Sequence, residues 1–217
     1  MDDDVLLQQN VQDELRWRPE IDPAHIGITA EGGVVTLTGH VRSYAEKRAV
    51  EDAVKRVVGV RGVADDLEVR LEDSDTNSDD EITQRALAAL GWNALVPAES
   101  VRVGVEHGWV QLTGTVCWQY QRSAAEDAVR SLSGVVGVRN EVSLKVQPQP
   151  EDITQRIGCA LRRSATIDAE GIRISVTDGV VTLEGTVGSW AERAHIEGVV
   201  WAGPGVRAVC DNLRVVA

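Results

Sequence analysis

The apolar residues of this chain follow two periods, and the combined pattern occurs three times. Near the start they recur at every fourth position, at Leu7, Val11 and Leu15, and farther on they alternate with polar residues. A period near four predicts a helix with one buried face, and alternation predicts a strand with one buried face. The stretch VVTLTGHVRSYAEKRAVEDAVKRVVGVRGVADDLEVRL, Val34 to Leu71, returns after shifts of 75 and 146 positions without insertion or deletion. We therefore interpret the chain as three copies of one unit of about 70 residues.

Each copy is expected to contain its elements in the order αββαβ. Two alternating stretches follow the first helix, joined by turns that end in Gly33, Gly108 and Gly179, as a hairpin turn with positive φ requires. A second helix, from about Tyr44 to Val57 in copy 1, leads to a last strand. Because strand–helix–strand connections are right-handed, that strand should lie parallel to the second strand. The expected fold class is α+β: three tandem two-layer sandwiches, each a three-stranded mixed sheet packed on two helices, over residues 4–71, 79–146 and 150–217.

Two glycines recur in every copy. One lies inside the second strand at an inward-facing position, where glycine normally destabilises a strand. We expect a helix backbone to pack closely there or the strand to bend, so that a side chain would clash. The other glycine marks the turn after the second helix. The two sets are Gly39, Gly114 and Gly185, and Gly59, Gly134 and Gly205.

The formal net charge is −12, and half of the acidic surplus lies in residues 72–81, which carry six acids and no base. An acidic chain without a basic tract is unsuited to nucleic acid, because neutralisation of phosphates supplies most non-specific affinity. It is also repelled weakly from anionic lipid unless local basic patches dominate.

The N-terminal sequence MDDDVLLQQN has no basic segment followed by an apolar one, and the chain has no apolar run of the ~18 residues that a membrane span needs. Cys117, Cys159 and Cys210 occupy unrelated positions of the three copies, which argues against a disulfide framework and fits a reducing compartment. These features predict a cytoplasmic protein. Removal of a signal peptide from a longer precursor would instead imply the periplasm.

The VVTLTG pattern of the second strand and the glycine–valine pairs before the third strand (Gly59-Val60, Gly134-Val135 and Gly205-Val206) resemble the BON domain, the bacterial OsmY and nodulation module. The resemblance covers nearly the whole chain. It implies binding of phospholipid or of proteins, without catalysis, in envelope maintenance, osmotic stress or the support of secretins and channels. Many members have a signal peptide or lipoprotein anchor. Since this chain shows neither, the resemblance implies a cytosolic, stress-related member.

Patterns typical of catalysis or metal binding are absent from the sequence. His25, His40, His107 and His195 share no position of the repeat, and there is no HExxH, CxxC, GxSxG or glycine-rich phosphate loop. We therefore expect no enzyme activity, no cofactor and no metal.

The acidic segment after copy 1 was compared with a calcium-binding loop. Asp73, Asp75 and Asn77 begin like an EF-hand, but Ser78 stands at the glycine position and Gln84 at the final glutamate position. A solvated tether is favoured over a calcium site.

Aromatic residues are the better indication of function. The chain has six tryptophans and no phenylalanine, and most of the aromatic positions lie outside the predicted apolar stripes. Displaced aromatics indicate contacts between copies, a partner surface or a membrane interface. Trp17 and Trp92 end the first helix of their copies. The candidate contact residues, most of them near the start of the second helix, are Tyr44, Trp118, Tyr120, Trp190, Trp201, Trp109, Arg48, Arg122 and Arg193.

Three hypotheses remain open from the sequence. The preferred one is a non-enzymatic module whose second-helix entrance contacts a phospholipid surface or an envelope protein. The second is an assembly module in which the tryptophans pack between copies or between subunits of a homo-oligomer. The third is a small-ion sensor that uses the acidic segment and clefts between copies.

Overall fold

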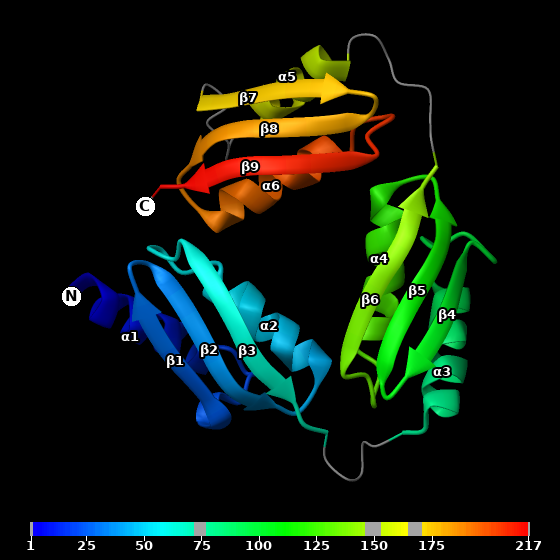
Figure 1. Cartoon of the computed structure of the whole chain (residues 1–217), viewed down its shortest axis with the longest axis horizontal. Helices are drawn as coiled ribbons and strands as arrows, with labels where there is room; N and C mark the ends of the chain where they lie inside the picture. Colours follow the sequence, from blue (N-terminus) through cyan, green and yellow to red (C-terminus); the bar gives the residue numbers. More distant parts are fainter. Residues whose placement is uncertain (1, 72–76, 146–152, 165–170, 217) are drawn as a thin grey trace. The chain divides into compact units, whose positions relative to one another are not determined.

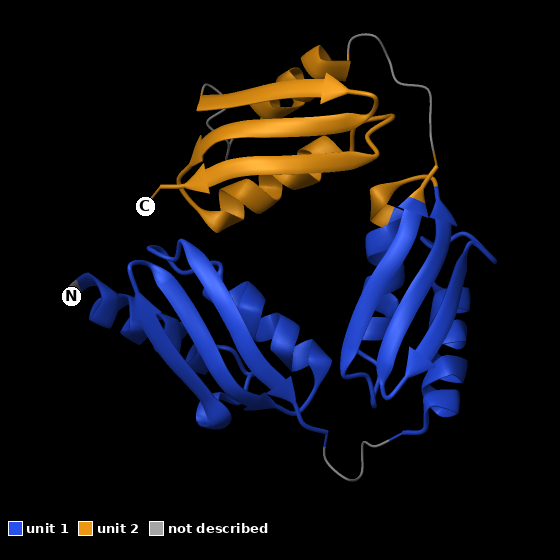
Figure 2. Cartoon of the chain, viewed as in Figure 1, with its two compact units in different colours: residues 1–116, 121–143 blue, residues 117–120, 144–217 orange. Residues whose placement is uncertain are grey.

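The computed structural model describes residues 2–71, 77–145, 153–164 and 171–216, and within them the chain forms three separate three-stranded sheets (Figure 1). Each sheet is accompanied by two helices, which confirms the expected α+β class and its three αββαβ copies. When residues are grouped by their contacts with one another, the chain divides into two compact units. One comprises residues 1–116 and 121–143, and the other comprises residues 117–120 and 144–217 (Figure 2). Each copy is described by itself.

The elements follow the predicted order in every copy. Copy 1 consists of α1 (Asp2–Trp17), the short 3₁₀ helix η1 (Pro23–His25), β1 (Ile26–Glu31), β2 (Val34–Val41), α2 (Tyr44–Val54) and β3 (Gly62–Val69). Copy 2 consists of α3 (Asp79–Trp92), β4 (Val101–Glu106), β5 (Trp109–Val116), α4 (Gln119–Arg130) and β6 (Gly137–Leu144). Copy 3 consists of α5 (Ile153–Arg163), β7 (Ile172–Thr177), β8 (Val180–Val187), α6 (Trp190–Trp201) and β9 (Ala208–Val215).

The second strand of each copy is the centre of its sheet. In copy 1, β2 pairs antiparallel with β1 and parallel with β3, and copy 3 repeats both pairings. The parallel third strand predicted from the right-handed connection is therefore confirmed in these two copies. In copy 2, β4 pairs antiparallel with β5, and β6 lies on the other side of β5.

The core of each copy lies between one face of its sheet and the two helices (Figure 1). The four-residue spacing of the first helix buries its stripe: Leu7, Val11 and Leu15 in α1 correspond to Ile82, Ala86 and Leu90 in α3. Alternate residues of the central strand, such as Val35 and Leu37, meet that stripe, and the residues between them lie on the open face. Each copy thus has one covered and one open sheet face, and ligands must be sought on the open face or the outer sides of the helices.

The glycine inside each central strand is required by the neighbouring strand. A Cβ at Gly39 would lie 2.0 Å from the carbonyl oxygen of His25, the residue before β1, and the φ of Gly39 is +109°. A Cβ at Gly114 would lie 2.1 Å from the carbonyl oxygen of Ser100, and a Cβ at Gly185 would lie 2.2 Å from that of Gly171. The close neighbour is therefore the carbonyl group at the entry of the first strand, which in copy 1 belongs to the last residue of η1, and not the backbone of either α-helix.

The second helix of copy 1 is shorter than predicted. Ser43 caps its start by accepting the backbone N–H of Glu46 at 3.1 Å. The buried carboxylate of Glu46 in turn accepts the backbone N–H groups of Asp22 and Arg42, at 2.7 and 2.9 Å. The helix ends at Val54 rather than Val57 because the backbone N–H groups of Arg56 and Val57 bond three residues back, as in a tightening last turn.

Candidate functional site

The aromatic side chains expected at the entrance of the second helix are mostly partly buried. Tyr44, Trp118 and Trp190 are half-buried, whereas Tyr120 is 55% exposed. Burial raises the pKa of the Tyr44 phenol. The guanidinium carbon of Arg193 lies 4.8 Å from the ring centroid of Trp190, within the range of a cation–π contact. Of these residues, Tyr120 presents the most side-chain surface to a ligand.

Trp201 and Trp109 occupy different surroundings. Trp201 packs against the core of copy 3, and its indole N–H donates to Oε1 of Glu197 at 3.2 Å. Trp109 lies on the open sheet face of copy 2 and is about half exposed. The two residues therefore do not belong to one surface with the second-helix entrance.

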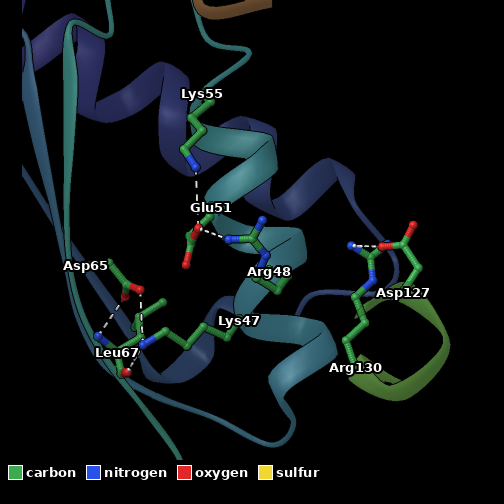
Figure 3. Close-up of polar contacts among 8 residues, drawn as sticks. All are labelled: Lys47, Arg48, Glu51, Lys55, Asp65, Leu67, Asp127 and Arg130. Carbon is green, nitrogen blue, oxygen red and sulfur yellow. Dashed lines mark hydrogen bonds and ion pairs between the residues drawn. The ribbon is translucent and has the colours of Figure 1, made fainter. Parts of the chain in front are cut away.

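The three basic candidates bind groups of their own copies. Arg48 donates to Oε2 of Glu51 at 2.8 Å, and Figure 3 shows Glu51 between Arg48 and Lys55. Arg122 donates to the backbone oxygen of Asn140 at 3.1 Å. The Nε group of Arg193 donates to Oδ2 of Asp211 at 2.6 Å.

The last two of these contacts reproduce a pairing seen in copy 1. There Lys47 donates to the backbone oxygen of Leu67 at 2.6 Å and forms an ion pair with Asp65 at 3.0 Å (Figure 3). The corresponding basic residues Lys47, Arg122 and Arg193 thus each link the second helix of their copy to its third strand. These contacts reduce the basic charge available to lipid headgroups at the helix entrance.

Three large exposed apolar side chains of copy 2 come from the C-terminal half of α3 and the turn that follows it. Trp92 is 90% exposed, and Leu87 and Leu95 are 51% and 56% exposed. Small exposed residues, Ala88, Gly91 and Ala94, lie between them in sequence. We call these six residues, Leu87, Ala88, Gly91, Trp92, Ala94 and Leu95, the α3 apolar surface.

The chain around the α3 apolar surface is uncharged and firmly attached to the fold. Between Arg85 and Glu99 there is no charged residue. Asn93 donates from its side-chain amide to the backbone oxygen of Ala124 in α4 at 3.2 Å, and accepts the backbone N–H of Leu95 at 3.0 Å. Leu90 and Val96 are buried on either side. Because the turn is fixed at both ends, Trp92 and Leu95 are held outside the core.

The other copies do not repeat this combination of apolar residues. Leu87 and Leu95 correspond to Gln12 and Glu20 in copy 1. Trp92 corresponds to Trp17 in copy 1, which is 84% exposed but stands between Arg16 and Arg18. In copy 3, Arg163 takes the position of Trp92. The fold therefore does not require the α3 apolar surface.

Sequence reasoning located Trp92 at the end of the first helix but did not select it as a contact residue. The available signal was the uncharged run from residue 86 to residue 98, which interrupts a chain that is 26% charged. Apolar spacing alone could not identify it, because the outward-facing Leu87 adjoins the buried Ala86 and blurs the helical period.

Within the described part of the chain, no three or more His, Cys, Asp or Glu side chains are grouped as a metal site. The rings of His25 and His40 stack with centroids 4.6 Å apart. Asp73 and Asp75 of the EF-hand-like segment lie outside the described residues. Among the described helices, none combines the length and hydrophobicity needed to span a membrane.

Comparison with known proteins relates the whole chain to one domain family. The BON domain matches residues 3–70, 78–146 and 150–217. Osmotically-inducible protein Y of Escherichia coli (strain K12) is 34% identical over 151 residues, which cover 66% of this chain and 73% of that protein. Two structures of CdsD, a structural protein of the type III secretion system of Chlamydia trachomatis, are 17% identical with a TM-score of 0.27. They cover 96% and 97% of this chain, and 91% and 98% of theirs, but the similarity is too distant to support an argument about function.

Proposed function

The chain belongs to the BON domain family, with three copies of the domain, and on that premise we propose that it is a non-enzymatic module that binds phospholipid surfaces through the α3 apolar surface. The observation that carries the proposal is the protruding, uncharged group of Leu87, Trp92 and Leu95 at the end of a helix. Since a relative is named as osmotically inducible, we further propose that this binding serves the cell under osmotic stress.

A membrane interface suits the chemistry of this surface. Tryptophan is enriched where membranes meet water, because the ring is mostly apolar and the indole N–H can bond to headgroups or water. The residues around Trp92 are leucine, alanine and glycine, which add apolar area without a charged group to desolvate. Trp92 also protrudes, with 90% of its surface exposed, and a fluid lipid surface accepts a protruding side chain without a complementary pocket.

The size of the surface predicts weak, reversible binding. Fully burying one large apolar side chain is worth roughly 1.5–3 kcal/mol. Scaled by the observed exposures, insertion of Leu87, Trp92 and Leu95 is worth on the order of 5 kcal/mol. That is similar to a single myristoyl chain, whose association constant of about 10⁴ M⁻¹ gives reversible attachment.

The acidic residues of α3 itself lie at the opposite end of the helix from the inserted side chains. Asp79, Asp80 and Glu81 lie in the first turn of α3, and Trp92 ends the helix. At about 1.5 Å per residue the two ends are roughly 20 Å apart. Because the Debye length is about 8 Å at physiological ionic strength, these charges are largely screened from a membrane at the other end.

Vesicle co-sedimentation tests the proposal. The intact protein should sediment with phosphatidylglycerol vesicles. Leu87→Gln with Leu95→Glu, which installs the copy 1 residues, should lower the association constant about thirtyfold, since roughly 2 kcal/mol of burial is removed. Trp92→Ala should act in the same direction. Trp17→Ala is the matched control, because it removes an equally exposed indole from charged surroundings, and it should leave binding unchanged.

Two outcomes would count against the proposal. If the intact protein does not bind vesicles, the membrane function is wrong. If Tyr120→Ala abolishes binding and the α3 variants do not, the second-helix entrance is the contact surface instead. Light scattering of the same samples would show whether the α3 apolar surface joins copies of this chain, since the leucine variants would then lower the molecular mass.

A further inference from the structure

The open face of the second sheet carries a hollow that the proposed membrane contact does not use. Its volume is about 450 Å³, and its lining includes Gly104, Glu106, Trp109, Gln111 and Arg139. These residues come from all three strands of the sheet, β4, β5 and β6. The hollow therefore rests on regular hydrogen-bonded backbone, which holds its side chains at fixed spacings.

The indole of Trp109 lies flat against the sheet. A Cβ built on Gly137 in β6 would come within 2.4, 2.6 and 2.7 Å of three neighbouring atoms of the indole ring, Cζ3, Cε3 and Cη2. Because the three distances are nearly equal, one ring face rests on the backbone at Gly137. The side chain is nevertheless 52% exposed. A planar apolar surface thus faces away from the sheet.

Polar groups of different kinds lie beside this ring. Glu106 is the cross-strand partner of Trp109, so the two side chains lie on the same face within a few ångströms. The amide nitrogen of Gln111 donates to Oε2 of Glu141 at 2.7 Å, which orients the Gln111 carbonyl oxygen. Among the described residues, Glu106 and Arg139 form no ion pair and no hydrogen bond. The hollow therefore offers an unpaired carboxylate and an unpaired guanidinium, whose charges cancel.

Space is available next to these groups because position 104 has no side chain. A Cβ at Gly104 would have no atom within 4 Å, and Gly104 lies opposite Gln111 on the neighbouring strand. A ligand that rests on the indole can extend over β4 at this point.

The other copies show that the fold does not need this arrangement. Val34 and Val180 occupy the position of Trp109. Thr29 and Ser175 fill the position of Gly104. The position of Arg139 is taken by alanine in copy 1 and by cysteine in copy 3. A set of side chains found in one of three sheets with the same strand order is explained by a ligand better than by folding.

We propose that this hollow binds a pyranose unit of a saccharide. A pyranose ring has an apolar face of C–H groups that stacks on an exposed indole, and its rim of hydroxyl groups needs both donors and acceptors. Glu106 and the Gln111 carbonyl oxygen accept hydrogen bonds, and Arg139 donates them. A ligand with a single charge would be attracted by one of the two charged side chains and repelled by the other. A neutral polyol satisfies both. This inference is independent of the membrane function.

Nuclear magnetic resonance of the full chain tests the site directly. The indole N–H signal of Trp109 is assigned by its absence in Trp109→Phe, and the intact protein is titrated with maltose, trehalose and chitotriose. At least one of these probes should shift that signal saturably, with a Kd of about 1–50 mM, as expected for a shallow site that covers one face of a small ligand. Glu106→Gln and Arg139→Ala should each weaken binding about threefold to tenfold. Trp17→Ala should not change the Kd.

Comparing the disaccharides maltose and trehalose with the trisaccharide chitotriose shows whether the natural ligand is a free sugar or part of a glycan chain. Preference for chitotriose indicates a glycan chain, and equal affinity indicates a free sugar. The proposal is overturned if no saccharide shifts the Trp109 signal up to about 100 mM, well above the expected Kd. Saturable binding that persists in Glu106→Gln and Arg139→Ala also overturns it, and neither variant removes an apolar group from the core. Binding of glycine betaine in place of every saccharide would assign the hollow to a zwitterion instead.

Discussion

Single residues fall into those that all three copies share and those that one copy has alone. Gly39, Gly114 and Gly185 are shared because a Cβ at each position would lie at about the same short distance from a carbonyl oxygen. Trp109 and the leucines at positions 87 and 95 occur in copy 2 alone. Since the three sheets have the same topology, a shared residue is explained by the fold and a unique one requires a separate reason.

Replacing Gly39 by alanine should destabilise copy 1 strongly. The new Cβ would lie 2.0 Å from the carbonyl oxygen of His25, at a φ of +109° that alanine rarely adopts. We expect a loss of about 2–4 kcal/mol, the range for strain at a special backbone position. Hydrogen exchange measured by mass spectrometry on peptides of copy 1 checks this, because protection there should fall more than in copies 2 and 3.

The matched control is Gly32→Ala in the adjoining turn. Gly32 also has positive φ, at +58°, but a Cβ there would meet no atom within 4 Å. The cost should be about 1 kcal/mol, the conformational penalty alone. Equal effects of the two substitutions would show that the close carbonyl contributes nothing.

The sequence predicts which residues face inward but not what they face. Alternation placed Gly39 on the inner side of its strand, yet the contact with His25 depends on the strand register, which a single sequence does not specify. Likewise, alternation placed Trp109 on the outer face, but its position over Gly137 depends on the pairing of two strands far apart in the chain.

At the scale of elements, the two ends of α3 differ in charge: the first turn is acidic and the last turn is uncharged. Its start carries three acids and a capping box in which Ser78 and Glu81 bond to each other's backbone N–H groups. Its end carries Trp92 and uncharged neighbours. Acidic residues at the N-terminus are stabilised by the helix dipole, so the charge is placed where it helps the helix and is distant from the apolar end. The first turn also anchors the helix to the sheet through Asp79.

The attachment of α3 to the sheet through the carboxylate of Asp79 should depend on pH. It accepts the backbone N–H groups of Gly108 and His107, at 2.9 and 2.8 Å, in the turn between β4 and β5, and these hydrogen bonds lower the pKa of Asp79. Because the pKa is lower in the folded state, ionised Asp79 stabilises the fold at pH values above its unfolded-state pKa of about 3.9. This stabilisation is lost as the pH falls through the folded-state pKa. The amide signals of His107 and Gly108 should therefore titrate with a midpoint below about 3.9.

Asp79→Asn supplies the comparison. The variant should be less stable than the intact protein above about pH 4, and the difference should vanish at lower pH, where the native carboxyl is protonated. A titration midpoint at or above that of an ordinary aspartate would mean that the two backbone bonds do not favour the ionised form.

Helix and strand identities were predictable because their periods are regular, whereas the ends of elements and the placement of the exposed surface were not. Val57 continues the apolar pattern of α2, but the helix has already tightened and ended at Val54. The α3 apolar surface depends on the turn at Asn93, whose side chain bonds to Ala124 on another helix. Such long-range hydrogen bonds have no periodic signature in the sequence.

At the scale of the whole molecule, the charge balance distinguishes two ways of reaching a membrane. The chain carries a net charge of −12, and the basic residues near the second-helix entrance bond within their own copies. Attraction of basic side chains to anionic headgroups would weaken as salt is added. If the protein instead binds by inserting apolar side chains while its net negative charge is repelled by the membrane, binding should strengthen as salt is added.

Binding to phosphatidylglycerol vesicles should therefore increase with salt. Between about 25 and 250 mM NaCl the Debye length falls from roughly 20 Å to roughly 6 Å, which screens the repulsion between the acidic chain and the anionic surface. We expect the bound fraction in co-sedimentation to rise about twofold to fivefold over this range, and to stay nearly constant on uncharged phosphatidylcholine vesicles, where there is no net repulsion to screen. Trp92→Ala should lower binding on both kinds of vesicle at every salt concentration, because it removes apolar area rather than charge. A decrease with salt on the anionic vesicles would instead show that basic side chains, and not the α3 apolar surface, hold the protein at the membrane.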